Sequence, residues 1–438
     1  MKDKIRSNYH WVIAAVVLIE MLVWGGIGNN INGLFVIPVT ESLGISRGSY
    51  SLVMSLNSLM GFVSTMLSGI LFMHFGYKKL VMGGLAVAGL ALCFLFGSSK
   101  NLATLGFGVA IYGLCGGFCS TAGMTKIIGD WFHKKRGLVL GLVSSATGFG
   151  GSLFCILLTN VTQSHGWRMA YRTAGICALV TAVLLLLTIK NRPDDMKLRP
   201  YGEGQLPTKK RHRGGHSEDN WPGFSLQELV RKPTFYMMMA LTLLSCLSMY
   251  MAFYIVVPHM QDRGLTAEQA ATVQSVMLLG LSVAKILSGW LCDIIGPKWV
   301  TALCMIFGIV GMWLMADVTE MTAALIIISI YTVSLPLTTI TVPLLTTELF
   351  GYRAHDTAVG LLLSMVSVGG MIASPLINLM YDAMGSYRPG LKVAAILGVV
   401  VLVLYEVLYF LAKRDKRVTQ AEREAEKALK RDQQQMTL

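Results

Sequence analysis

The stretch GILFMHFGYKK, residues 69–79, recurs 220 positions later as GWLCDIIGPK, residues 289–298. Both copies keep a Gly, a Leu, a second Gly and a Lys at the same spacing, and both lie between long apolar segments. Four further pairs recur at an offset of 219 or 220, namely Pro38 and Pro258, Gly44 and Gly264, Gly141 and Gly360, and Gly150 and Gly369. A nearly constant offset over so much of the chain predicts two related halves with the same orientation.

The composition predicts an all-α integral membrane protein. Of the 438 residues 54% are hydrophobic and 14% are charged, whereas a soluble domain carries about 25% charged residues. A helix of about 20 apolar residues crosses roughly 30 Å of hydrocarbon. We predict twelve transmembrane helices, at approximately 11–38, 46–74, 80–98, 104–131, 136–161, 168–189, 234–258, 267–292, 298–316, 321–345, 355–381 and 389–412.

The longest polar segment, rich in Pro, Gly and charge, divides the chain near its middle. We therefore expect an N-terminal six-helix half at 1–189, a cytoplasmic linker at 190–232, a C-terminal half at 233–412 and a charged cytoplasmic tail at 413–438. The two halves are predicted to form pseudo-symmetric six-helix bundles with a substrate path between them.

The net charge of +13 is explained by topology rather than by binding to nucleic acid. With both termini inside, the predicted inner segments hold 28 Lys and Arg, and the outer loops hold 7. This asymmetry predicts a multi-pass cell-membrane protein with cytoplasmic N- and C-termini, and the basic inner face would attract anionic lipid. All eight Cys fall in predicted spans, and no metal, cofactor or catalytic constellation is present, so we expect neither a cofactor nor an enzyme.

The repeated stretch resembles the signature of the major facilitator superfamily, Gly-x-Leu-x-Asp-x-x-Gly-x-Lys/Arg-Lys/Arg. Met73 replaces the acid in the first copy, and Asp293 keeps it in the second. The segments 33–47, 131–137 and 166–168 resemble the branch of monocarboxylate and oxalate/formate transporters. The resemblance implies a twelve-helix fold and transport by alternating access. It also implies a cytoplasmic gate in which Asp293 faces Arg136 at the start of the fifth helix.

Ionisable residues deep in a membrane are candidates for function because they are costly to bury. Lys285 lies eight residues before Asp293, about 12 Å deep at the helical rise, and occupies the place where the resembled family has an anion-binding Arg. Glu20 is predicted at a similar depth, where it either pairs with a cation such as Lys285 or carries a coupled proton. Lys126 is shallower, and its stem is long enough to reach the cytoplasmic surface.

Uncharged polar residues in the spans are further candidates. Asn30 and Tyr331 are our predicted substrate-binding residues beside Lys285, and Asn57, Tyr250 and Tyr254 are also polar positions within spans. Hydrogen bonding between helices is the alternative for each of them.

These features predict a monomeric secondary transporter of a small organic anion, with a monocarboxylate favoured because the helix at 355–381 lacks a second cation. We expect proton symport, with Glu20 as the coupling residue, and contact with membrane lipid but not with nucleic acid. The alternatives are an exchanger of organic anions and a membrane sensor that binds the anion without moving it. A fold alone does not determine the substrate.

Overall fold

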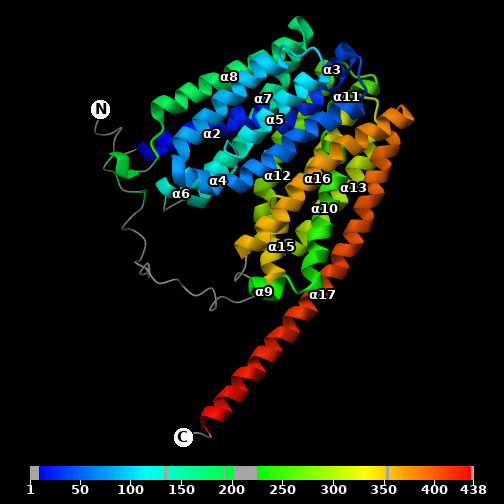
Figure 1. Ribbon diagram of the computed structural model, residues 1–438. Coiled ribbons are helices and arrows are strands. Elements are labelled where there is room, and N and C mark those ends of the chain that lie inside the picture. Colours follow the sequence, from blue (N-terminus) through cyan, green and yellow to red (C-terminus); the bar gives the residue numbers. More distant parts are fainter. Residues whose placement is uncertain are drawn as a thin grey trace.

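The computed structural model describes residues 9–119, 121–132, 136–191, 193–196, 198, 200–201, 224–351 and 355–435. Eleven helices in these ranges are long and apolar enough to cross a membrane, and the shorter apolar helix α5 lies in the remaining predicted span. The all-α membrane fold predicted from composition is therefore confirmed, and Figure 1 shows its helices packed side by side.

The N-terminal half runs through α2 (Tyr9–Ile27), η1 (Asn29–Phe35), α3 (Val36–Leu43), α4 (Arg47–Leu90), η2 (Ala91–Phe96), α5 (Leu102–Gly116), α6 (Thr121–Trp131), α7 (Arg136–His165) and α8 (Trp167–Thr188). Between the halves lie the short η3 (Pro193–Met196) and α9 (Leu226–Leu229). The C-terminal half runs through α10 (Pro233–Phe253), α11 (Val256–Asp262), α12 (Ala267–Ile295), α13 (Pro297–Met315), α14 (Met321–Thr332), η5 (Leu335–Leu337), α15 (Thr341–Phe350), α16 (His355–Met384) and α17 (Arg388–Gln435).

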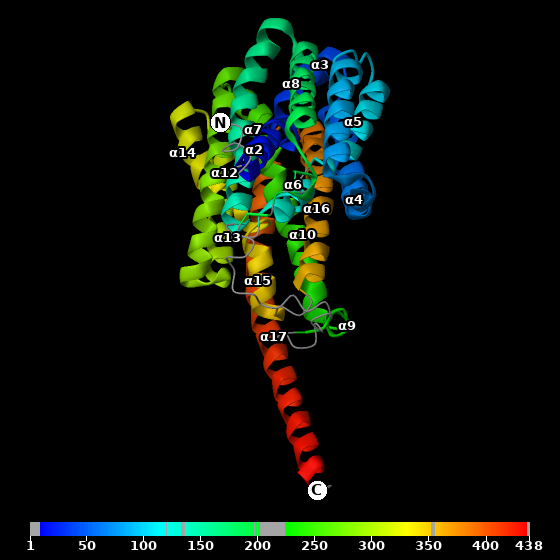
Figure 2. The same cartoon turned by 90° about the vertical axis from the view of Figure 1, so that its left-hand side faces the viewer.

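The α4 helix covers the second predicted span and most of the third. The two spans are separated at Gly76, where the backbone leaves the helical conformation with a φ of 75°. Figure 2 shows α17 continuing well beyond the bundle as a single long helix. We call the end of the bundle at which α2 begins and from which α17 extends the linker end. The other end, where α11 contacts η1, is called the far end.

The repeat is visible in the backbone as well as in the sequence. Matched glycines adopt the left-handed conformation in both halves, where a side chain would be strained. The pairs are Gly44 and Gly264 (φ 63° and 96°), Gly76 and Gly296 (75° and 88°), and Gly166 and Gly385 (83° and 68°). The third pair, 219 positions apart, extends the repeat to a turn that the sequence comparison did not include.

Four predicted spans are interrupted helices rather than continuous ones. The breaks lie after α2, between α5 and α6, between α10 and α11, and between α14 and α15. These are the first and fourth spans of each half, so the interruptions follow the repeat. The pattern of apolar residues did not predict them. The break after α2 carries Asn29, Asn30 and Asn32, and the other three breaks lie within mostly apolar sequence.

Hydroxyl groups bond to the backbone at two of these breaks, between α5 and α6 and between α14 and α15. The Gly117 N–H donates to Ser64 Oγ of α4 at 2.9 Å. In the C-terminal half Ser334 Oγ donates to the Tyr331 carbonyl at 2.7 Å, and Thr341 Oγ1 donates to the Leu337 carbonyl at 2.8 Å. Such partners are needed because lipid offers none to an exposed backbone group.

The two halves pack together along α7 with α12 and along α4 with α16. Hydroxyl and thiol groups cross the α7–α12 contact: Ser282 Oγ donates to the Ser145 carbonyl at 3.1 Å, and Ser275 Oγ donates to the Ser152 carbonyl at 3.1 Å. Gly148 lies between these two bonds. A Cβ at Gly148 would stand 2.6 Å from the backbone oxygen of Leu278. The backbones of α7 and α12 are therefore too close here for any side chain larger than that of glycine.

We predict that Gly148→Ala destabilises the protein by about 1–3 kcal/mol, because the added methyl forces α7 away from α12. Gly141→Ala, on the same helix, is the matched control, since a Cβ there meets nothing within 4 Å. Thermal unfolding of the detergent-purified protein measures both effects. Equal melting temperatures for the two variants would contradict the close contact of α7 and α12 at Gly148.

Candidate functional site

A cavity of about 630 Å³ lies between the halves, at the level of the helix breaks. The last turns before three breaks line it: Trp24 of α2, Tyr112 of α5, and Tyr250 and Phe253 of α10. The fourth contributes Leu335 of η5, and α4, α12 and α16 complete the wall. The interruptions in the helices therefore bring aromatic side chains and irregular backbone to one place between the two halves.

Among the described residues, Lys285 is the only formally charged one that lines this cavity. It projects from α12, and within the described part of the chain no hydrogen bond or ion pair engages its amine. Its other polar neighbours on the wall are uncharged and include Ser58, Thr65, Ser364 and Ser367. An unpaired ammonium in an apolar setting is expensive, so this cavity favours an anion.

Glu20 lies elsewhere. Its side chain is fully buried in the N-terminal half, where the Tyr77 hydroxyl donates to Oε2, and Oε1 has no partner. It does not line the cavity, and no ion pair joins it to Lys285. The expected contact between these two residues is therefore absent from this conformation, because Glu20 faces the packed interior around Tyr77 and Cys119.

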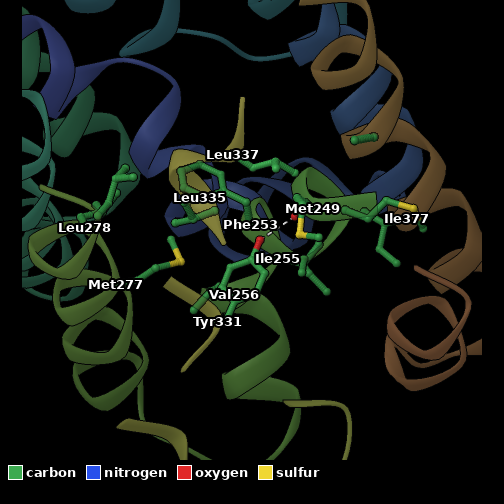
Figure 3. Close-up of a cluster of buried hydrophobic side chains, with 14 of the residues drawn as sticks. Met249, Phe253, Ile255, Val256, Met277, Leu278, Tyr331, Leu335, Leu337 and Ile377 are labelled. Atoms are coloured by element: carbon green, nitrogen blue, oxygen red, sulfur yellow. Dashed lines mark hydrogen bonds between the residues drawn. The ribbon is translucent and has the colours of Figure 1, made fainter. Parts of the chain in front are cut away.

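Tyr331 is also outside the cavity wall. Figure 3 shows it among the packed side chains of the C-terminal half, with its hydroxyl directed at Met249. That hydroxyl donates to the Met249 carbonyl at 2.5 Å, and the side chain is fully buried. The prediction of Tyr331 as a substrate ligand is not supported by this placement, because its only polar group is already engaged in the core.

The remaining predicted residues are placed as follows. Asn30 lies in η1, but its side chain is outside the described part. Asn57, Tyr250 and Tyr254, named from sequence as polar span residues, all line the cavity. Lys126 pairs with Asp130 at 2.7 Å on the surface of α6, in agreement with its shallow predicted position.

The predicted gate residues are at the linker end. Asp293 is exposed near the end of α12, and Arg136 begins α7, with its side chain outside the described part. The structure therefore describes no contact between them.

The halves are joined instead at the far end. Arg47, at the start of α4, forms a two-pronged ion pair with Asp262 of α11 at 2.6 and 2.9 Å. Its guanidinium also lies 4.0 Å from the ring centre of Tyr381 on α16. Beside it, the Gly48 N–H donates to Asp382 Oδ2 at 2.8 Å. Paired charges with this geometry are among the stronger polar contacts, so they join the two halves at the far end.

Sequence reasoning missed Arg47 as a gate residue, and it missed Trp24 and Tyr112 as cavity residues. A signal was present for the last two: each aromatic residue directly precedes a glycine pair or cluster in an otherwise apolar helix, Gly25-Gly26-x-Gly28 and Gly113-x-x-Gly116-Gly117. Closely spaced glycines next to a large ring mark the places where these helices stop.

Comparison with known proteins agrees with the architecture. The Major Facilitator Superfamily profile matches residues 13–355 and 238–436. The chain therefore belongs to the Major Facilitator Superfamily.

The chain is 27% identical over 270 residues to monocarboxylate transporter 13 of Bos taurus, covering 60% of this chain and 58% of that protein. It is 21% identical over 320 residues to a gallate transporter of Pseudomonas putida, covering 69% and 70%. The chain spans less than half the length of some other curated relatives that it matches. In fold it is similar to a bacterial homologue of the human lysosomal transporter Spinster, with a TM-score of 0.72, 17% identity, and 93% and 97% coverage.

We predict that Arg47→Gln opens the far end of the cavity, since it removes the charge that faces Asp262 and Tyr381. A cysteine introduced at Ser58 on the cavity wall should then react about tenfold faster with a membrane-impermeant thiol reagent applied from the far-end side. Lys126→Gln is the control, because it removes an exposed ion pair within one half. An unchanged rate in Arg47→Gln would contradict the assignment of this ion pair as a closure.

Proposed function

We propose that the protein is a secondary transporter of a small organic anion, most favourably a monocarboxylate, which works by alternating access with proton symport. The observation that carries the proposal is Lys285. Among the described residues it is the single charge on the cavity between the two halves, and no ion pair or hydrogen bond engages its amine. A carboxylate is the natural partner for an isolated ammonium. The names of two relatives, a monocarboxylate transporter and a gallate transporter, support this substrate class.

The proposed orientation places the linker end in the cytoplasm of a cell-membrane protein. It rests on the distribution of Lys and Arg, which gather in the segments at that end. The Arg47–Asp262 pair then closes the outer side. We further propose that Asp293 approaches Arg136 and the start of α7 when the inner side closes, because a carboxylate is stabilised at a helix N-terminus and beside a cation.

For Glu20 the proposed role is to carry the coupled proton. The sequence allows two roles for Glu20, as a member of a structural ion pair or as a proton-binding site. The described residues around it offer the Tyr77 hydroxyl and no cation. Because an unpaired buried charge is costly, such surroundings suit a neutral carboxylic acid, which is the loaded form of a proton carrier.

An exchanger of organic anions and a non-transporting sensor are the alternative functions. Reconstituted protein separates them directly. Uptake driven by a pH gradient into empty proteoliposomes supports symport, uptake only with an anion inside supports exchange, and binding without uptake supports a sensor.

Lys285→Gln is expected to abolish uptake of the anion while the protein still inserts and folds, since the change removes a costly charge from the membrane interior. Lys285→Arg should keep part of the activity because the charge remains, although the planar guanidinium changes the geometry. Uptake of radiolabelled substrate into proteoliposomes measures both. If Lys285→Gln transports the anion with near-normal apparent affinity, Lys285 does not bind the substrate.

Glu20→Gln is expected to abolish accumulation driven by a pH gradient but to permit exchange of substrate across the membrane, because the amide cannot take up and release the proton. The matched control is Tyr77→Phe, which removes the hydroxyl partner of Glu20 and leaves a titratable carboxyl. The control should retain accumulation. A well-folded Glu20→Gln protein with full pH-driven uptake would exclude the proton role.

A further inference from the structure

The wall of the cavity is aromatic on both sides. In the N-terminal half the rings of Trp24 and Tyr112 are stacked, with centroids 5.0 Å apart and planes 17° from parallel. In the C-terminal half Tyr250, Phe253 and Tyr254 form a cluster with centroid separations of 5.5 to 5.8 Å. All five side chains line the same cavity as Lys285. Such rings favour a flat partner that can stack on them or meet them edge to face.

Tyr112 carries a hydroxyl without a partner, and the repeat provides an internal comparison. Tyr331 stands 219 positions after Tyr112, the offset that relates Gly141 to Gly360. The Tyr331 hydroxyl donates to the Met249 carbonyl, whereas among the described residues the Tyr112 hydroxyl has no hydrogen-bond partner although the side chain is buried. A buried hydroxyl normally has a partner. Because the Tyr112 side chain lines the cavity, a ligand acceptor that reaches this hydroxyl would supply one.

The size of the cavity points in the same direction. A volume of about 630 Å³ corresponds to roughly 20 water molecules at the density of the liquid. A small aliphatic acid such as acetate would leave most of this volume filled with water. A ring-bearing acid occupies it with groups that match the wall.

We infer that the substrate is an arene carboxylate that bears a hydroxyl or carbonyl oxygen on its ring. The carboxylate binds Lys285, the ring packs against Trp24, and the ring oxygen accepts a hydrogen bond from Tyr112. This inference rests on the proposed function, in which Lys285 binds the carboxylate. It adds a reason for selectivity, since the two halves then contact different parts of one molecule.

The test is isothermal titration calorimetry on the full-length protein in lipid nanodiscs with three monocarboxylates of similar size. Benzoate should bind about fivefold more tightly than cyclohexanecarboxylate, which has the same charge and no π face. 4-Hydroxybenzoate should bind about fivefold more tightly than benzoate, through the added hydrogen bond. Lys285→Gln should abolish binding of all three.

Two variants assign the preferences to residues. Trp24→Leu should bring the affinities for benzoate and cyclohexanecarboxylate together, and Tyr112→Phe should remove the advantage of 4-hydroxybenzoate over benzoate while leaving benzoate unchanged. The matched control is Tyr331→Phe, which removes the equivalent hydroxyl from the core. It should lower the melting temperature and leave the order of affinities unchanged.

The outcomes separate the two proposals. If the three acids bind equally and Lys285→Gln abolishes binding, the inference about the ring is overturned and the carboxylate site stands. If Tyr112→Phe leaves the advantage of 4-hydroxybenzoate intact, the hydroxyl assignment is overturned. If neither these acids nor acetate binds the wild-type protein, the carboxylate site fails together with the inference.

Discussion

Backbone groups inside hydrocarbon need partners from the protein, and this requirement explains where the site can be. A helix can stop within a membrane only where its freed N–H and C=O groups meet other protein groups or a water-filled space. In this chain the helices stop at four places related by the repeat, and residues at those places line one cavity. Ser64, Ser334 and Thr341 provide hydroxyl partners to the backbone there. The breaks thus bring irregular backbone to the cavity, and hydroxyl groups satisfy freed backbone groups at two of the four breaks.

The two halves have similar backbone conformations, but they contribute different side chains to the cavity. Lys285 corresponds by the offset of 220 to Thr65, and both residues line the cavity, so one equivalent position carries a charge and the other a hydroxyl. Tyr112 and Tyr331 also differ: among the described residues the Tyr112 hydroxyl has no partner, whereas the Tyr331 hydroxyl is engaged in the core. A symmetric scaffold with asymmetric side chains can hold an asymmetric ligand, with its charged end toward one half and its ring toward the other.

The fold could be predicted from sequence because its signals are long and redundant. Apolar runs, the Lys and Arg asymmetry and repeated glycines all depend on many residues, so one substitution such as Met73 in the signature does not hide them. The deep charges Lys285 and Glu20 were also found, since an ionisable residue in an apolar span stands out.

What could not be predicted was which way a side chain faces when a helix ends within the membrane. Tyr331 was predicted on the cavity, yet its equivalent Tyr112 is the one on the wall. Arg47 gave no signal because a cation at a span end is ordinary, and its partner Asp262 is 215 positions away.

If Glu20 carries the coupled proton, as proposed, its separation from the cavity gives Trp24 a role in coupling. Glu20 and Trp24 are four residues apart on α2 and therefore lie on the same face, about one turn from each other. Trp24 lines the cavity and also packs against the buried cluster that surrounds Glu20.

Direct exchange of partners between Lys285 and Glu20 would require a charge to cross this cluster, whereas displacement of the Trp24 ring changes the packing on both sides at once. A ligand can shift a conformational equilibrium only through contacts that differ between the states. On the proposed function, stacking of the substrate on Trp24 is such a contact, because it acts on a side chain that touches both the cavity and the surroundings of Glu20.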